Sequence, residues 1–262
     1  MIYGDKTELL RKGLFDVQNE VGLGYGEEAY HQAYATWLGE QGIPFASKQS
    51  HVLKIGNGVA YTLQPDFVVW DCITIELKAV ARRLRNEELV QLFDYLKCRG
   101  DKLGILVNMG LDRVFVRRLV YESSNGSINE NLNSWKNCID GDERELGKKV
   151  RQAIVNVFDQ HGTGYGRKVT EKLLCCSLQS LHCPFKMSPV GSAYYQDKLV
   201  DKSHLDCLVI DGSLLLSFTA LFDNNQFSIS RSLSYMKTLG IKWGIAVNFG
   251  KTKLEITSLC CF

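Results

Sequence analysis

The chain lacks the features of a membrane or secreted protein. No apolar stretch in its 262 residues approaches the roughly 20 residues that a membrane-spanning helix needs. The first residues, MIYGDK, lack the basic start and apolar segment of a signal peptide. Hydrophobic residues make up 45% and charged residues 23%, the balance of a globular protein. We therefore expect a soluble, cytoplasmic protein with no membrane partner.

The cysteines lack the spacing of a zinc site or a disulfide framework. There are nine of them, an odd number, and none has CxxC spacing. Cys175 and Cys176 are adjacent, as are Cys260 and Cys261, which suits neither an ordinary disulfide nor a zinc knuckle. We expect reduced thiols in the core or at the surface.

The chain repeats itself at an offset of 140 residues. Residues 22–26 read GLGYG and residues 162–166 read GTGYG, while GILVNMG at 104–110 becomes GIAVNFG at 244–250. The other pairs at this offset are Asp66 with Asp206, Asp71 with Asp211, and residues 95–97 with 235–237. Separated blocks in one register indicate an internal duplication.

A polar segment separates the two copies. Residues 123–131 read SSNGSINEN, which is rich in turn-forming side chains and has little to bury. We predict a first domain over residues 1–122, a polar linker over 123–141 and a second domain over 142–262. Either domain is long enough to bury a core of its own.

Each copy has the pattern of an α/β domain. Apolar residues recur at helical spacing near the start of both, as Leu10 and Leu14 in the first and Val150 and Ile154 in the second. Asp5 with Glu8 predicts a capping box for the first helix. The segments predicted next are a helix ending at Gly42, strands at 51–55, 67–70 and 73–80, a helix at 86–97 and a buried strand at 104–108.

Two charged residues interrupt an apolar strand of the first copy. Glu76 and Lys78 share one face of the predicted strand 73–80, because side chains alternate along a strand. Asp66 opens the preceding strand and would bring a second carboxylate to the same side. Two carboxylates suit Mg²⁺, which polarises a phosphate and lowers the pKa of a bound water. Alternatively, Glu76 and Lys78 form a simple ion pair at a strand edge.

Together these motifs resemble the PD-(D/E)XK nuclease superfamily, and within it the GxxExxY family of small bacterial proteins. Residues 24–30 read GYGEEAY, PD at 65–66 precedes ELK at 76–78, and residues 91–97 and 107–110 supply the later motifs over residues 5–122. The resemblance implies α/β domains with a restriction-endonuclease-like αβββαβ core, in which helices flank a mixed sheet. It implies a nuclease that hydrolyses phosphodiester bonds with Mg²⁺ or Mn²⁺.

The resemblance also assigns roles to particular residues. The implied site consists of the acidic residues Glu27, Asp66 and Glu76, which would bind the metal, the catalytic lysine Lys78 and the accessory Gln91. Glu27 has a simpler interpretation too, because the first turn of a helix favours a carboxylate. We predict that Tyr30 is a packing residue with its hydroxyl tied to the site, and that His31 is structural or solvated.

Three arginines follow the ELK strand directly. Arg82, Arg83 and Arg85 are candidates for clamping substrate phosphates, although a charge run also suits a solvated face. No platform of aromatic residues accompanies them, and the net charge of +2 excludes no substrate. We expect a nucleic-acid partner, DNA rather than RNA, although no groove-reading motif is present.

The second copy has lost the site. At the offset of 140, Arg167 replaces Glu27 and Arg231 replaces Gln91, while Asp206 remains. One aspartate cannot hold a magnesium ion, so we predict that this copy is inactive.

The residues that replace the ELK motif depend on the alignment. The constant offset places Leu216 and Phe218 there, whereas a one-residue insertion places Ser217 and Thr219. We expect this copy to be a structural or substrate-binding half of an intramolecular pseudo-dimer, by analogy with dimeric nucleases. The alternative for the whole chain is a non-catalytic module that binds nucleic acid or protein.

Overall fold

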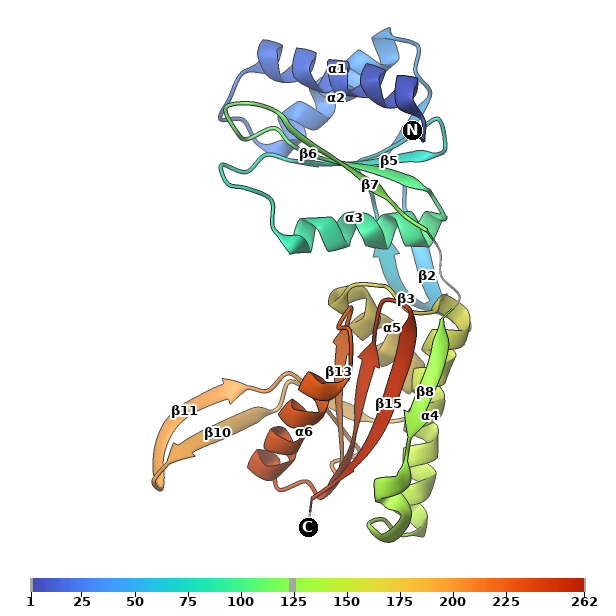
Figure 1. Cartoon of the computed structure of the whole chain (residues 1–262), viewed down its shortest axis with the longest axis vertical. Helices are drawn as coiled ribbons and strands as arrows, with labels where there is room; N and C mark the ends of the chain where they lie inside the picture. The colour runs from blue at the N-terminus through green and yellow to red at the C-terminus, as the bar shows by residue number, and fades with distance from the viewer. Residues whose placement is uncertain (1, 123–125, 262) are drawn as a thin grey trace. The chain divides into compact units, whose positions relative to one another are not determined.

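The computed structural model describes residues 2–122 and 126–261. The chain divides into two compact units (Figure 1). One comprises Met1–Leu53 and Thr62–Ser123, and the other comprises Lys54–Tyr61 and Ser124–Phe262. The part of the predicted linker at 123–125 lies outside the described residues. In the described part of the chain, no helix has the length and hydropathy needed to cross a membrane.

The first unit is built on a mixed five-stranded sheet. Its elements are α1 (Gly4–Val21), α2 (Glu27–Glu40), β1 (Phe45–Ser47), β4 (Phe67–Val69), β5 (Ile73–Lys78), α3 (Asn86–Arg99), β6 (Leu103–Asn108) and β7 (Phe115–Val120). The strand order is β1-β4-β5-β6-β7, with β5 and β6 parallel and the other neighbours antiparallel. β2 (His51–Ile55) and β3 (Gly58–Leu63) form a separate two-stranded sheet.

The main core of this unit lies on one face of the sheet. α1 and α2 cover that face and α3 covers the other (Figure 1). Leu14 of α1 packs in one cluster with Ile75 and Leu77, and all three are fully buried. Because side chains alternate along β5, Glu76 and Lys78 point to the α3 side. The alternation of β5 therefore places its apolar residues on one face and its two charged residues on the other.

The predicted α/β class is confirmed, with differences in detail. The predicted strand 51–55 exists but pairs with β3 outside the main sheet, whose edge is β1 instead. Asp5 does not cap α1, because the helix already begins at Gly4 and its N-cap is Tyr3, in the left-handed conformation. Thr7 instead donates its hydroxyl to the carbonyls of Tyr3 and Gly4 at 3.0 and 2.8 Å.

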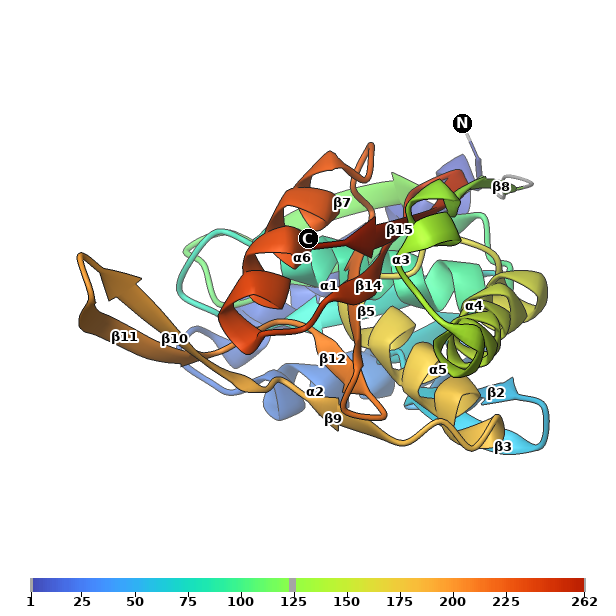
Figure 2. The same cartoon turned by 90° about the horizontal axis from the view of Figure 1, so that it is seen from below.

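The second unit repeats this plan with a six-stranded sheet. Its helices are α4 (Gly141–His161), α5 (Arg167–Ser180), α6 (Gln226–Leu239) and the short 3₁₀ helix η1 (Asn133–Asn137). Its strands are β8 (Ser127–Asn131), β9 (Phe185–Met187), β12 (Leu208–Ile210), β13 (Leu214–Ala220), β14 (Trp243–Phe249) and β15 (Lys253–Cys260), in the order β8-β15-β14-β13-β12-β9. β10 (Val190–Tyr195) and β11 (Lys198–His204) form a separate ribbon. α4 and α5 lie on one side of the sheet and α6 on the other (Figure 2).

β8 and η1 lie within the segment predicted as a linker. β8 pairs in parallel with β15, with Ser127 opposite Lys253 and Asn131 opposite Thr257. It is an edge strand that is mostly exposed and polar, with Ile128 as its one apolar residue, so it lacks the apolar alternation by which strands are predicted. The structure therefore places residues 127–131 in the second sheet.

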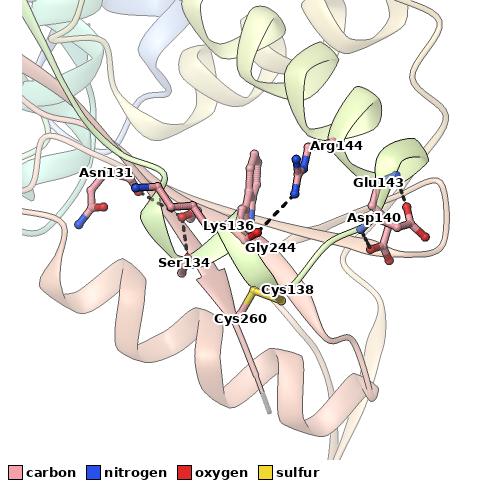
Figure 3. Close-up of a disulfide and its surroundings, with 11 residues drawn as sticks. Asn131, Ser134, Lys136, Cys138, Asp140, Glu143, Arg144, Gly244 and Cys260 are labelled. Carbon is pink, nitrogen blue, oxygen red and sulfur yellow. Dashed lines mark hydrogen bonds between the residues drawn. A yellow bond between two sulfur atoms is a disulfide. The ribbon is translucent and has the colours of Figure 1, made fainter.

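A disulfide fastens the segment after η1 to the end of β15 (Figure 3). Cys138 bonds Cys260, with their Cα atoms 6.4 Å apart, and nearby Ser134 and Ser258 share a hydrogen bond of 2.6 Å. The expectation that all cysteines are reduced is therefore wrong. Adjacency argues only against a bond between Cys260 and Cys261, and leaves Cys260 open to a distant partner. The other seven cysteines are not in disulfides.

Gly110 gives a test of how tightly the first unit is packed. A Cβ atom there would lie 2.5 Å from the backbone nitrogen of Val80, whereas one at Gly39 in α2 would meet no atom within 4 Å. Because backbone cannot rotate away, we expect Gly110→Ala to destabilise the protein by about 1–3 kcal/mol. Gly39→Ala should be neutral or stabilising by up to about 1 kcal/mol, because alanine favours a helix. Thermal unfolding measures both, and equal Tm values for the two variants would contradict the packing described.

Candidate active site

The β4–β5 hairpin brings Asp66 to the ELK motif. Phe67 pairs with Ile75 in an antiparallel ladder, so the residue that precedes β4 lies opposite the end of β5. The Oδ2 atom of Asp66 accepts a hydrogen bond of 2.7 Å from the backbone N–H of Leu77. Asp66 is 7% exposed and Glu76 is 3% exposed. The two neighbouring strands predicted from the sequence form a hairpin that buries two carboxylates side by side.

Glu76 and Lys78 form an ion pair on the shared face of β5. The Nζ atom of Lys78 lies 2.6 Å from Oε1 of Glu76. The other carboxylate oxygen, Oε2, is buried and has no hydrogen-bond partner among the residues that the structure describes. A buried polar atom without a partner costs free energy, which a hard cation at this oxygen would recover.

Burial shifts the proton equilibrium of this pair. Burial and, to a smaller extent, the charge of Asp66 raise the pKa of Glu76, Lys78 opposes them, and the net result is a pKa of about 8. For Lys78, burial disfavours the charged form, but the charge and hydrogen bond of Glu76 outweigh it and raise the pKa of the ammonium. Without a cation, burial and the charge of Asp66 therefore favour the protonated form of Glu76 more strongly in the folded protein than in the unfolded chain. A perturbed acid beside a second carboxylate is typical of functional sites.

Glu27 reaches the site through Lys78. It is the first residue of α2, its side chain is 44% exposed, and its Oε2 atom lies 3.7 Å from the Lys78 ammonium. Partial burial raises the pKa of Glu27, and Lys78 opposes this shift. Within the described ranges, no three acidic, histidine or cysteine side chains are close enough to form a metal site. The structure thus does not bring Glu27 into one ligand set with Asp66 and Glu76, because its side chain is turned toward Lys78.

Asp66 and Glu76 nevertheless suit a magnesium or manganese ion. Both supply carboxylate oxygens, and Mg²⁺ commonly binds through one or two carboxylates while keeping several waters. The unpartnered Oε2 of Glu76 is the atom that such an ion would contact.

The remaining predicted site residues lie on or just before α3. The side-chain amide of Gln91 donates to the hydroxyl of Tyr95 at 2.7 Å. Arg82 forms an ion pair with Glu88, and Arg83 and Arg85 are exposed. The Glu88 carboxylate therefore already engages one of the three arginines predicted to bind phosphate.

Tyr30 and His31 pack as structural residues. Tyr30 is fully buried, and its hydroxyl donates to the carbonyl of Gly22 at 2.7 Å, not to a site residue. His31 is 6% exposed and stacks on Phe67, with 4.3 Å between the ring centres. Its Nε2 lies 3.3 Å from the carbonyl of Asp66, so the histidine supports the backbone of a site residue.

Asn108 is a positioning residue that the sequence analysis missed. It is fully buried at the end of β6. Its Oδ1 accepts from the N–H groups of Val80 and Gly110, and its Nδ2 donates to the carbonyls of Val80 and Arg82, all at 2.9–3.0 Å. These bonds hold the segment that follows Lys78. Its position in an otherwise apolar strand, and its repetition as Asn248 in the second copy, are the sequence features that could have indicated this role.

Strand pairing settles which residues of the second copy replace the ELK motif. Thr74 pairs with Gly104 in the first sheet, and Leu215 pairs with Gly244 in the second. Since the two glycines are equivalent in the repeat, β13 is displaced by one residue. Ser217 therefore replaces Glu76 and Thr219 replaces Lys78, as the insertion alternative predicts.

The same displacement corrects the equivalence of Asp66 and Asp206. The carbonyl of Asp66 accepts from Lys48 N, and the carbonyl of Cys207 accepts from Ser188 N. Cys207 therefore takes the backbone position of Asp66, and Asp206 stands one residue earlier. The extra residue lies in the β10–β11 ribbon, whose ladder has a bulge between Ala193 and Tyr194.

Substitution of Glu76 tests its unusual protonation. The ordinary pKa is 4.5 and the folded value is about 8, so the folded state holds an extra proton between these values. The stability that this proton contributes is complete below pH 4.5 and is lost as the pH rises through 8. We therefore expect the Tm of Glu76→Gln, relative to wild type in EDTA, to rise between pH 5 and pH 9. The exposed control Glu8→Gln should show a flat difference, and a flat or falling difference for Glu76→Gln would contradict the assignment.

Comparison with known proteins gives one family and one distant structural neighbour. The PD-(D/E)XK nuclease superfamily matches the chain twice, over residues 5–119 and 144–259. A comparison with curated proteins finds no match. An alkaline exonuclease from Laribacter hongkongensis is similar with a TM-score of 0.32 and 14% identity, over 60% of this chain and 66% of the exonuclease chain. The two matched stretches correspond to the two copies of the repeat, and the chain belongs to the PD-(D/E)XK nuclease superfamily as a tandem pair.

Proposed function

We propose that the first copy is a metal-dependent nuclease that hydrolyses phosphodiester bonds of nucleic acid, with DNA as the favoured substrate. The observation that carries this proposal is the state of Glu76. Its carboxylate is buried beside Asp66 and Lys78, and one of its oxygens lacks a partner among the described residues. A buried carboxylate with an unpartnered oxygen destabilises the folded state. We therefore expect the chain to keep it because it serves a function.

Each side chain has a role in this proposal. Asp66 and Glu76 hold Mg²⁺ or Mn²⁺, which when bound polarises the phosphate and lowers the pKa of a water. Lys78 stabilises negative charge on the phosphate oxygens, because its ammonium lies on the same face of β5 as Glu76. Glu27 orients Lys78 from 3.7 Å away.

The remaining groups lie on α3 and in the segment just before it. Gln91 is an accessory polar residue on α3, held by Tyr95. Arg83 and Arg85 are exposed and free to approach substrate phosphates, whereas Arg82 first has to leave Glu88. The second copy is proposed to be inactive and to act as a substrate-binding half.

Cleavage assays test the assignment of Glu76 and Lys78. Labelled DNA and RNA are incubated with wild type, Glu76→Gln and Lys78→Ala in Mg²⁺ or Mn²⁺. We expect wild type to cleave, and each variant to be slower by about 10²–10³-fold or more, the usual cost of removing one electrostatic contact to the transition state. Glu8→Gln and Lys12→Ala, at exposed positions of α1, are matched controls and should retain activity.

Calorimetry of metal binding completes this test. Glu76→Gln should weaken Mg²⁺ binding, because it removes a charged ligand. Full cleavage by Glu76→Gln would refute the proposed site. A wild-type protein that neither binds metal nor cleaves would show instead a non-catalytic module that retains the nuclease fold.

A further inference from the structure

In the second copy, positively charged side chains occupy positions equivalent to residues of the acidic first site. α2 and α5 both begin after an extended glycine N-cap, and their first residues are Glu27 and Arg167. The next position changes from Glu28 to Lys168. The other equivalent pairs are Asp66 with Cys207, Glu76 with Ser217, Lys78 with Thr219, and Gln91 with Arg231. A group of acids around one lysine has become a group of cations.

Two arginines from different helices converge at this place. Arg167 of α5 and Arg231 of α6 each donate to one carboxylate oxygen of Asp206, the latter at 2.7 Å. Both also donate to the carbonyl of Phe218, at 2.7 and 2.9 Å. Phe218 is the counterpart of Leu77 in the ELK motif. Two guanidinium groups therefore meet beside the counterpart of the ELK motif.

The protein satisfies only part of this charge. Each guanidinium has five N–H donors, and Arg231 places one further bond on Ser217, at 3.1 Å. The Nε atom of Arg231 is buried and has no acceptor in the described part of the chain. The Glu171 carboxylate approaches Arg167 only to 3.9 Å. The partly exposed Arg167 side chain therefore offers N–H groups to a further acceptor.

The electrostatics around Arg167 and Arg231 favour the binding of an anionic ligand. Burial lowers the pKa of Arg167, Asp206 opposes the shift, and the charge of Arg231 lowers it further. Arg167 also opens α5, where the helix dipole is positive, and the first turn contains no acid. The side chains of Arg167 and Asp206 are 36% and 43% exposed, whereas that of Arg231 is 15% exposed, so a ligand reaches the site mainly through Arg167.

We propose that Arg167 and Arg231 form a binding site for a backbone phosphate of the nucleic acid that the first copy cleaves. The proposal rests on the nuclease function above. Arginine suits this ligand because its planar fork donates two parallel hydrogen bonds to phosphate oxygens. The first copy thus has a cation-binding site, and the degenerate copy has in its place a site that binds the anionic substrate.

Asp206 separates this proposal from a purely internal ion pair. In a phosphate site the carboxylate competes with the ligand for the same N–H groups, so Asp206→Asn tightens binding. In an internal ion pair the same variant leaves two uncompensated arginine charges, lowers the Tm and leaves nucleic-acid affinity unchanged.

Binding of a fluorescein-labelled DNA duplex by the full chain tests the site. The background variant Lys78→Ala in EDTA prevents cleavage, and anisotropy is measured across a range of salt concentrations. Arg167→Gln with Arg231→Gln should weaken binding and reduce the slope of log K against log salt by about 0.9 for each lost phosphate contact. Lys148→Gln with Lys149→Gln, exposed on α4, removes the same charge and should leave the slope nearly unchanged.

Each outcome decides the question. A smaller slope only for the arginine variant, with tighter binding by Asp206→Asn, supports the site. Equal effects of the arginine and lysine variants, or an unchanged affinity of Asp206→Asn, overturn it. The single variant Arg167→Gln, at a half-exposed position, replaces the double variant if circular dichroism shows that the latter is unfolded. A wild-type chain that neither binds nor cleaves nucleic acid refutes the nuclease function itself, a result distinct from failure of this site alone.

Discussion

The hydrogen bond from Leu77 N to the Asp66 carboxylate connects the two parts of the candidate site. It forms because the β4–β5 hairpin sets the residue before β4 against the end of β5. The alternation of β5 then commits Leu77 to the core and Glu76 and Lys78 to the other face. Every further feature of the site, including the buried ion pair and the shifted proton equilibrium, depends on this register.

Burial gives these charges their chemical character. An exposed pair of glutamate and lysine would be an ordinary surface ion pair of little energetic consequence. Glu76 is almost completely buried, so its pKa rises and one oxygen stays without a partner among the described residues. The first unit thus maintains an unfavourable arrangement that a divalent cation would relieve. Asn108 keeps the following segment in place with four hydrogen bonds.

The duplication shows how one backbone supports opposite electrostatics. The frame of three helices around a mixed sheet recurs in the second unit, and the positions of Glu27 and Gln91 are taken by Arg167 and Arg231. Guanidinium groups there contact the carbonyl of Phe218 and the carboxylate of Asp206. Both copies of the fold therefore concentrate charged side chains at equivalent positions, and the side chains at those positions determine whether the charge is negative or positive.

The sequence by itself determined the duplication, the α/β class and the charged residues of the first site. These depend on local period and motif spacing, which one chain displays directly. Only the tertiary structure revealed three features: the polar edge strand β8, the bond between Cys138 and Cys260, and the hydrogen bonds by which Asn108 holds the segment after Lys78. The alignment of Asp66 with Cys207 did too, because a single extra residue in a hairpin leaves no trace in composition. Pairing between strands fixes such a register through hydrogen bonds that join segments distant in the chain.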